Sequence, residues 1–244
     1  MRRSMRSAIC GVAVFVCVVA PAAAQFPAEG RARVRAVQHY RAGVEFLSGE
    51  EFEKAVAEFR AAIKIDSVFT DAYYGLGQAH MGLRRYVSAA QAFQSCLEAA
   101  RKLHELSVRA GVQRELDRQD ELRELRDTIR HMGPDREWRA ARLHNYISEL
   151  ERLAIRTDRP FEPPPLVLLA LGSAHFRNGD AGRAEYYWRE AARIDDSLGE
   201  AWNNLAAIYA QSGRRADAVV ALTNAERAGY RVNPQLKDEI QKLR

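Results

Sequence analysis

The sequence contains few of the residues that interrupt helices or cross-link small folds. Its 244 residues include 8 prolines, 15 glycines and 3 cysteines. So few helix breakers leave room for long helices, and so few cysteines argue against a disulfide framework. Hydrophobic residues make up 47% of the chain and charged residues 28%, which indicates a folded protein rather than a disordered one.

The first 24 residues are typical of a secretory signal peptide. Three arginines within the first six positions precede an apolar run over residues 8–20, and three alanines at 22–24 precede Gln25. The alternative is an uncleaved membrane anchor, which needs about 20 apolar residues. This run is shorter and Pro21 interrupts it. We expect cleavage before Gln25, a mature chain without a transmembrane segment, and a periplasmic or secreted location.

Removing this segment changes the charge argument. It carries three arginines and no acid, so the formal net charge of +5 falls to about +2 for residues 25–244. Such a balance does not favour nucleic acid as a partner. Two of the three cysteines also leave with the segment, and Cys96 alone cannot form an internal disulfide.

Four stretches of the remaining chain share one pattern of small and large residues, and we name them repeats 1 to 4. They begin at Ala36, Thr70, Pro165 and Gly199, so both pairs start 34 residues apart. Counted from each start, places 4, 7, 8 and 11 share one face of a first helix, and places 20, 24 and 27 share one face of a second. Place 8 is always small: Gly43, Gly77, Gly172 and Ala206. Place 20 is always alanine: Ala55, Ala89, Ala184 and Ala218.

The pattern resembles the tetratricopeptide repeat (TPR) family over about 136 residues. Repeat 2 carries it most clearly, with Tyr73, Leu76, Gly77, His80 and Ala89. The resemblance implies an all-α right-handed superhelix whose concave groove binds another protein. The chain departs from the family where each repeat usually ends in proline, at Ser67, Arg101, Asp196 and Tyr230.

An insertion separates repeats 1 and 2 (residues 36–103) from repeats 3 and 4 (165–232). Residues 101–160 hold 14 basic and 12 acidic residues. Apolar residues recur at helical spacing on both sides of a break at Gly133-Pro134: Leu116, Leu122, Leu125 and Ile129, then Leu143, Ile147, Leu150 and Ala154. We predict an antiparallel helical hairpin, with a proline-rich joint, over 104–164, and a capping helix over 233–244.

The role of this hairpin stays open at this point. It is either a charged spacer or a coiled-coil arm that binds a partner. A nucleic-acid-binding arm is disfavoured because acids nearly balance bases and the only aromatics of residues 101–160 are Trp138 and Tyr146.

No pattern in the sequence supports catalysis, a metal site or a cofactor. The six histidines form no close ligand pair. His39, His80 and His175 take repeat places where aromatic residues usually pack. Asp195-Asp196 falls in a predicted turn, and Cys96 takes the small buried place of a second helix.

The expected partner-binding groove follows from places 2, 5, 9 and 12 of the first helices. The candidates are Tyr40, Val44, Asp71, Tyr74, Gln78, Met81, Leu169, Ser173, Phe176, Glu200 and Asn203. Tyr40 and Gly75 stand where the family's clamp for a terminal carboxylate needs Lys and Asn, so that partner class is disfavoured. The remaining set favours a hydrophobic peptide or helix, with Tyr40, Tyr74 and Phe176 as its anchors.

These observations together predict a non-enzymatic scaffold or adaptor of the cell envelope that binds a protein partner. Two alternatives remain open. One is a structural homo-oligomer assembled through the hairpin. The other is an envelope enzyme or carbohydrate-binding protein that uses the groove.

Overall fold

The computed structural model describes residues 27–133, 137–153 and 160–242, so the predicted signal peptide lies outside the described residues. The described residues form ten helices and no strand. The helices are α1 (Gly30–Ser48), α2 (Phe52–Ile65), α3 (Thr70–Gly82), α4 (Tyr86–Arg130), α5 (Glu137–Arg152), α6 (Pro165–Arg177), α7 (Ala181–Ile194), α8 (Gly199–Gln211), α9 (Arg215–Arg227) and α10 (Pro234–Lys242).

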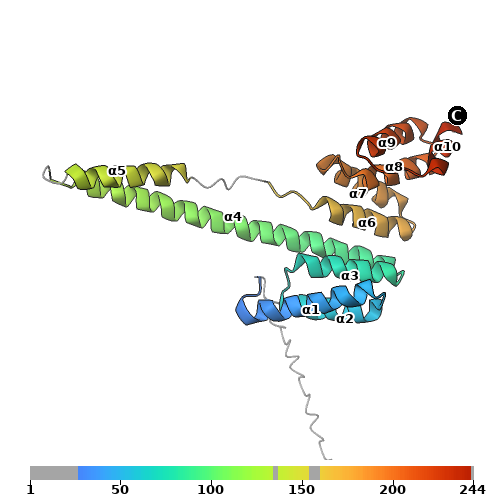
Figure 1. Cartoon of the computed structure of the whole chain (residues 1–244), viewed down its shortest axis with the longest axis horizontal. Coiled ribbons are helices and arrows are strands. Elements are labelled where there is room, and N and C mark those ends of the chain that lie inside the picture. Colours follow the sequence, from blue (N-terminus) through green and yellow to red (C-terminus); the bar gives the residue numbers. More distant parts are fainter. Residues whose placement is uncertain (1–26, 134–136, 154–159, 243–244) are drawn as a thin grey trace, which may run out of the picture.

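The helices pack as pairs that stack along one direction (Figure 1). Repeats 1 to 4 are α1/α2, α3 with the first part of α4, α6/α7 and α8/α9, and α10 packs against α8 and α9. The all-α architecture of helical repeats, inserted hairpin and C-terminal capping helix is therefore confirmed. We use "array" below for these four repeats and α10.

The turn inside each repeat is closed in the same way. Place 15 has a left-handed backbone in all four repeats, with φ of 58° at Glu50, 55° at Arg84, 83° at Gly179 and 70° at Gly213. Glycine adopts this conformation without a steric cost, whereas an L side chain does not. Repeats 3 and 4 therefore have the favoured residue, and repeats 1 and 2 hold a strained one.

Small residues at places 8 and 20 allow the paired helices to approach closely. All four place-20 alanines are fully buried. A Cβ atom added to Gly77 would lie 2.4 Å from Cε1 of Phe93, and one added to Gly172 would lie 2.6 Å from Cδ1 of Trp188. Both rings belong to place 24, so the place-8 glycine makes room for the large residue that fills the repeat.

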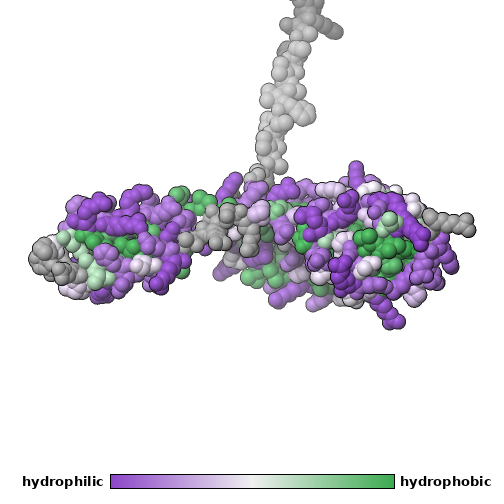
Figure 2. Space-filling view, turned by 90° about the horizontal axis from the view of Figure 1, so that it is seen from above, coloured by the Kyte–Doolittle hydropathy of each residue, from purple (hydrophilic) through white to green (hydrophobic). Residues whose placement is uncertain are grey.

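The insertion forms an arm that projects from the array (Figure 1). Helix α4 is 45 residues long, because the second helix of repeat 2 continues into the arm without a break. Helix α5 folds back on its far half through a seam of Leu122, Ile147 and Leu150, which are 5%, 7% and 9% exposed. Figure 2 shows the surface of the arm as mostly purple, hydrophilic side chains, with a smaller strip of green, hydrophobic ones among them.

The chain returns to the array beside α4. The ring of Phe161 lies 5.6 Å from that of His104, and the guanidinium carbon of Arg101 lies 5.5 Å from the Phe161 ring centroid. These contacts close the base of the arm next to repeat 2. None of the helices in the described ranges, α4 included, is long and apolar enough to cross a membrane.

A fully buried acid ties α1 to the junction of repeats 1 and 2. Asp66 is 0% exposed and pairs with the guanidinium of Arg33, while its Oδ1 accepts the Val68 backbone N–H at 3.2 Å. The Arg33 guanidinium also lies 4.3 Å from the Phe69 ring centroid. A buried carboxylate requires such partners, because an unpaired charge in the interior is costly.

Candidate functional site

The first helices of repeats 2, 3 and 4 share one hollow on the array, which we name the groove pocket. Its volume is about 550 Å³. Helix α3 contributes one side chain, α6 three, α7 one and α8 three. The lining residues are Met81, Ser173, Phe176, Arg177, Trp188, Glu200, Asn204 and Ala207.

Aromatic rings form the apolar part of the groove pocket. Trp188 is 3% exposed, and its indole N–H donates to the Leu169 carbonyl at 3.2 Å. Phe176 packs on Trp188 with ring centroids 5.5 Å apart and remains 37% exposed. Ser173 donates its hydroxyl to the same Leu169 carbonyl at 2.9 Å. These contacts hold Phe176 on a fixed support while leaving part of its ring open to a ligand.

The rim of the groove pocket carries charges of both signs. Arg177 and Glu200 are exposed, and Asn204 is half-buried. Burial raises the pKa of Tyr74 above its usual value, and the Glu200 carboxylate raises it further, so Tyr74 lies within the field of the same rim. Arg177 and Glu200 therefore leave the rim without an excess of one charge.

The structure brings four of the eleven predicted groove residues together. Met81, Ser173, Phe176 and Glu200 line the groove pocket. Leu169 does not belong there: it is 7% exposed and packs in the main core cluster. The prediction for Leu169 was wrong because α6 is covered by both α4 and α7, so its place 5 faces the interior.

The predicted anchors Tyr40 and Tyr74 are half-buried within their own repeats. The ring of Tyr40 lies 6.0 Å from Phe59 and 5.2 Å from Phe69, and that of Tyr74 lies 5.5 Å from Phe93. They support the repeats and expose only part of their surface. Phe176 is the predicted anchor that reaches the groove pocket.

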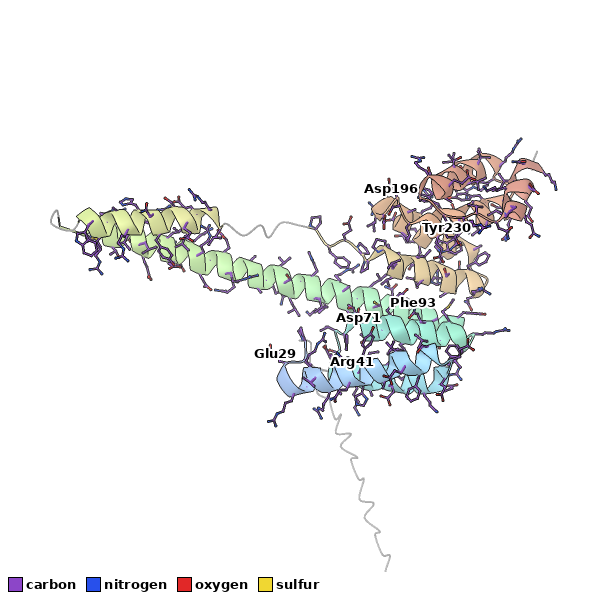
Figure 3. The ribbon with its side chains drawn as sticks, viewed as in Figure 1. Glu29, Arg41, Asp71, Phe93, Asp196 and Tyr230 are labelled. Carbon is purple, nitrogen blue, oxygen red and sulfur yellow. The ribbon has the colours of Figure 1, made fainter. Side chains whose placement is uncertain are left out.

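The other predicted residues are not among those that line the groove pocket. Val44, Asp71 and Gln78 are exposed, and Asn203 is half-buried. Asp71 stands near the start of α3, and Phe93 lies on the neighbouring α4 (Figure 3).

Sequence reasoning missed half of the groove pocket. Ala207 occupies place 9 of repeat 4 and could have been found with the rule already applied to the other repeats. Arg177 and Asn204 occupy places 13 and 6, and Trp188 belongs to a second helix, so only the angle between neighbouring repeats brings them to the pocket.

Three of the residues considered for chemistry, Cys96, Asp195 and His39, have polar partners within the fold. Cys96 is 2% exposed, its thiol donates to the Thr70 carbonyl at 3.3 Å, and burial raises its pKa to about 12, so it stays a neutral thiol. Asp195 accepts the Ser197 backbone N–H at 3.0 Å and its hydroxyl at 2.6 Å. Nδ1 of His39 lies 2.7 Å from Glu58 Oε2. Within the described ranges, no three His, Cys, Asp or Glu side chains could together hold a metal ion.

Two family models match the region of repeats 1 and 2. A family model described as TPR repeat matches residues 43–83, and one described as tetratricopeptide repeat matches residues 70–103. Superkiller protein 3 of Schizosaccharomyces pombe is 42% identical over 55 residues, which are 22% of this chain and 4% of that protein. This chain therefore matches only a small part of that relative.

Solved structures with partial similarity to this chain include two TPR proteins. A thermophilic TPR protein of Thermus thermophilus, TTC0263, has 18% identity and a TM-score of 0.37, covering 85% of this chain and 98% of that one. YrrB, whose structure is described as a TPR protein with an unusual peptide-binding site, has 19% identity and a TM-score of 0.30, covering 85% and 92%. Repeats of this family generally serve as scaffolds for protein–protein interaction.

Proposed function

This chain is a tetratricopeptide-repeat protein, and from that premise we propose that it is a non-enzymatic scaffold whose groove pocket binds an apolar segment of a partner protein. The observation that carries the proposal is the partly exposed Phe176 on the buried indole of Trp188, at a hollow shared by three repeats. An aromatic ring held on a rigid support gives a large contact area at little entropic cost.

The ligand follows from the shape and charge of the hollow. Met81 and Phe176 offer an apolar surface, and Ser173 and Asn204 offer polar groups beside it. With Arg177 and Glu200 both on the rim, net attraction to a tail of one charge is weak. We therefore propose a short extended peptide, or one face of a helix, with a large apolar side chain that contacts Phe176.

A peptide selection tests this proposal. A library of displayed random peptides is selected on the intact chain, and the binding of recovered peptides is measured by fluorescence anisotropy. We expect Phe176→Ala to weaken binding about tenfold or more, since losing a central aromatic contact costs at least about 1.4 kcal/mol. Tyr186→Ala is the matched control, because Tyr186 is 60% exposed on α7 and lies outside the groove pocket.

The control also separates the groove from other surfaces. Equal loss of binding in both variants, or full binding by a Phe176→Ala variant with native circular dichroism, would contradict the groove assignment. If Phe176→Ala alone loses binding, affinity purification from the native cell envelope followed by mass spectrometry would identify the natural partner.

Assembly through the arm is a second candidate function, favoured by the apolar residues that the arm leaves exposed. Leu116 is 49% exposed and Trp138 is 66% exposed. Light scattering of the purified chain tests this candidate. A monomer at micromolar concentration would reject it and leave the groove scaffold.

The export of the chain is part of the same proposal. It rests on the signal-like composition of residues 1–24 and supports a role in the cell envelope or outside the cell. N-terminal sequencing of the exported protein should give Gln25 as the first residue. An intact Met1 in the membrane fraction would indicate an anchor instead.

A further inference from the structure

Each repeat places one ring at the turn between its two helices, at place 11. We name these four side chains the turn rings: Phe46, His80, His175 and Tyr209. Their carbonyls accept the backbone N–H five residues later, at 2.8–2.9 Å, from Glu51, Arg85, Asp180 and Arg214. The turn rings therefore have equivalent positions, so their environments can be compared directly.

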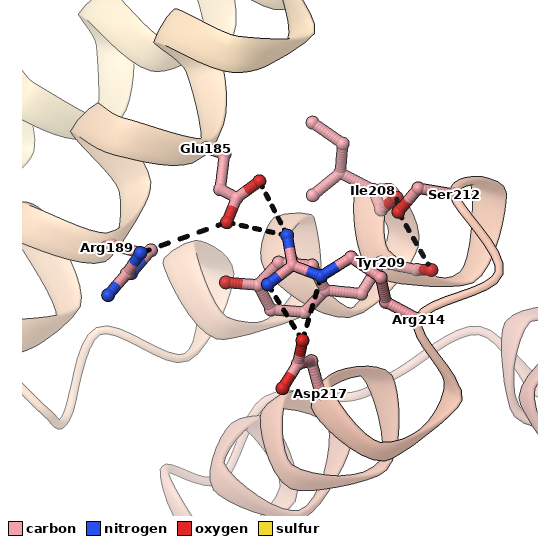
Figure 4. Close-up of polar contacts among 7 residues, drawn as sticks. All are labelled: Glu185, Arg189, Ile208, Tyr209, Ser212, Arg214 and Asp217. Carbon is pink, nitrogen blue, oxygen red and sulfur yellow. Dashed lines mark hydrogen bonds and ion pairs between the residues drawn. The ribbon is translucent and has the colours of Figure 1, made fainter.

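In the two outer repeats a cation lies over the turn ring. Nζ of Lys54 is 5.3 Å from the Phe46 ring centroid, and the guanidinium carbon of Arg214 is 4.3 Å from that of Tyr209. Figure 4 shows Arg214 across the Tyr209 ring, paired with Glu185 and Asp217. A cation is attracted to the face of an uncharged ring.

In repeat 2 the turn ring is a buried histidine, with Arg60, Arg85 and Glu53 as the charged groups that act on it. His80 is 4% exposed, and among the described residues its Nδ1 is buried without a hydrogen-bond partner. Burial lowers the pKa of His80, and Arg60 of α2 and Arg85 of the turn lower it further. Glu53 opposes them, but both of its oxygens already accept from Arg85, at 2.7 and 3.2 Å.

In repeat 3 the turn ring is a histidine as well. His175 stacks on Tyr187 with centroids 5.5 Å apart and an interplanar angle of 11°. Burial lowers the pKa of His175, Arg183 of α7 lowers it further, and Asp180 opposes them. Asp180 is itself 3.3 Å from the Arg183 guanidinium. His175, Tyr187 and Arg183 line a hollow between α6, α7 and α4. The α4 side chains that line it, Gln91 and Gln94 among them, are uncharged.

We propose that repeats 2 and 3 form an acid-sensitive centre of the array, in which a proton on His80 or His175 opens the turn of that repeat. The cations that lie over neutral rings in repeats 1 and 4 have counterparts here that would repel a protonated imidazole. Met81 and Phe176 directly follow the two histidines and line the groove pocket, so acid would also disturb that pocket.

The direction of the pH effect follows from the pKa values of the two histidines in the folded and in the unfolded chain. In the unfolded chain both histidines titrate near their usual pKa of about 6.5. In the folded chain both pKa values lie lower, so the unfolded state takes up protons first. The two histidines therefore contribute their full stabilisation above about pH 6.5. Below that value the folding constant falls, by up to about tenfold per pH unit for each histidine.

Two measurements test the proposal on the intact chain without any ligand. Nuclear magnetic resonance titration of the imidazole signals should give midpoints for His80 and His175 below the usual value of about 6.5. Urea unfolding at pH 7.5 and 5.5 should show a lower folding constant of the wild type at pH 5.5, by up to about tenfold for each histidine. The double variant His80→Phe, His175→Tyr, which copies the outer repeats, should lose much less.

The outcomes separate this idea from the groove proposal, because neither measurement involves a partner. His144→Gln is the control and should behave as the wild type, since His144 is an exposed residue of the arm. Midpoints for His80 and His175 at or above the usual value of about 6.5 would overturn the proposal even if the double variant failed to fold. The proposal would also be overturned if the double variant folds and its folding constant falls between pH 7.5 and 5.5 as much as that of the wild type.

Discussion

The array and the arm are both helical and rich in charge, but they are held together differently. In the array, rings such as Phe59, Phe93 and Trp188 are at most 3% exposed and fit against glycines of the paired helix. In the arm, the core is the narrow cluster around Leu122 and Ile147, with Leu125 and Ile129 only partly buried. The difference teaches that close packing of large rings against small residues specifies the array, whereas apolar residues at helical spacing are enough to form the arm.

Polar contacts across the arm supplement its narrow seam. Arg118 donates to the Leu150 carbonyl at 3.1 Å, and the Tyr146 hydroxyl donates to Glu121 at 2.9 Å. Arg126 and Glu151 form an ion pair at 2.6 Å, with both side chains about half exposed. Exposed pairs of this kind contribute little, typically below about 1 kcal/mol. The arm should therefore be the less stable of the two regions.

The largest effect is expected from emptying a ring site of the array. Phe93 is 1% exposed and packs against Gly77 and Tyr74. Phe93→Ala should lower the free energy of unfolding by about 3–5 kcal/mol, through lost burial and a cavity that the fixed helices cannot close. Urea unfolding followed by circular dichroism measures this change.

The arm supplies the matched control for this prediction. Trp138→Ala removes a larger aromatic side chain, but Trp138 is 66% exposed. This variant should unfold within about 0.5 kcal/mol of the wild type. Similar losses in both variants would mean that ring packing does not distinguish the array from the arm.

The packing of the array could be predicted because it depends on pairs of residues at a fixed spacing within each repeat. Gly77 goes with Phe93 and Gly172 with Trp188, whereas repeat 4 combines Ala206 with the smaller Leu222. A smaller residue at place 24 leaves room for a methyl group at place 8. Such pairing at a fixed spacing needs no knowledge of how repeats are oriented.

A second prediction overfills the same crossings. Ala89 and Ala184 are both 0% exposed at place 20. Ala89→Leu or Ala184→Leu should cost about 1–3 kcal/mol, because close-packed helices must move apart to accept the larger side chain. Denaturation midpoints measure the loss, and Ala141→Leu on the exposed face of α5 is the control. Unchanged midpoints for both buried sites would contradict the repeat register.

Features that depend on neighbouring repeats could not be predicted from the sequence. Leu169 follows the groove pattern but is covered by α4 and α7, and Asn204 rather than Asn203 reaches the groove pocket. The sequence does not indicate that Asp66 is fully buried, because its partner Arg33 lies 33 positions earlier. Each of these depends on the rotation between helices that are distant in the chain.

The smallest effect on the array is expected from the largest deletion. Because Phe161 lies against His104 and Arg101, the two ends of the arm meet at its base. The arm cluster also shares no residue with the core clusters of the array. Replacing residues 106–159 with a short Gly-Ser joint should therefore leave the unfolding free energy of the array within about 0.5 kcal/mol of the wild type.

The denaturant slope of this deletion variant should fall, since less surface becomes exposed on unfolding. Urea unfolding gives both quantities. An aggregated product, or a loss of several kcal/mol, would show that the arm is part of the array's core.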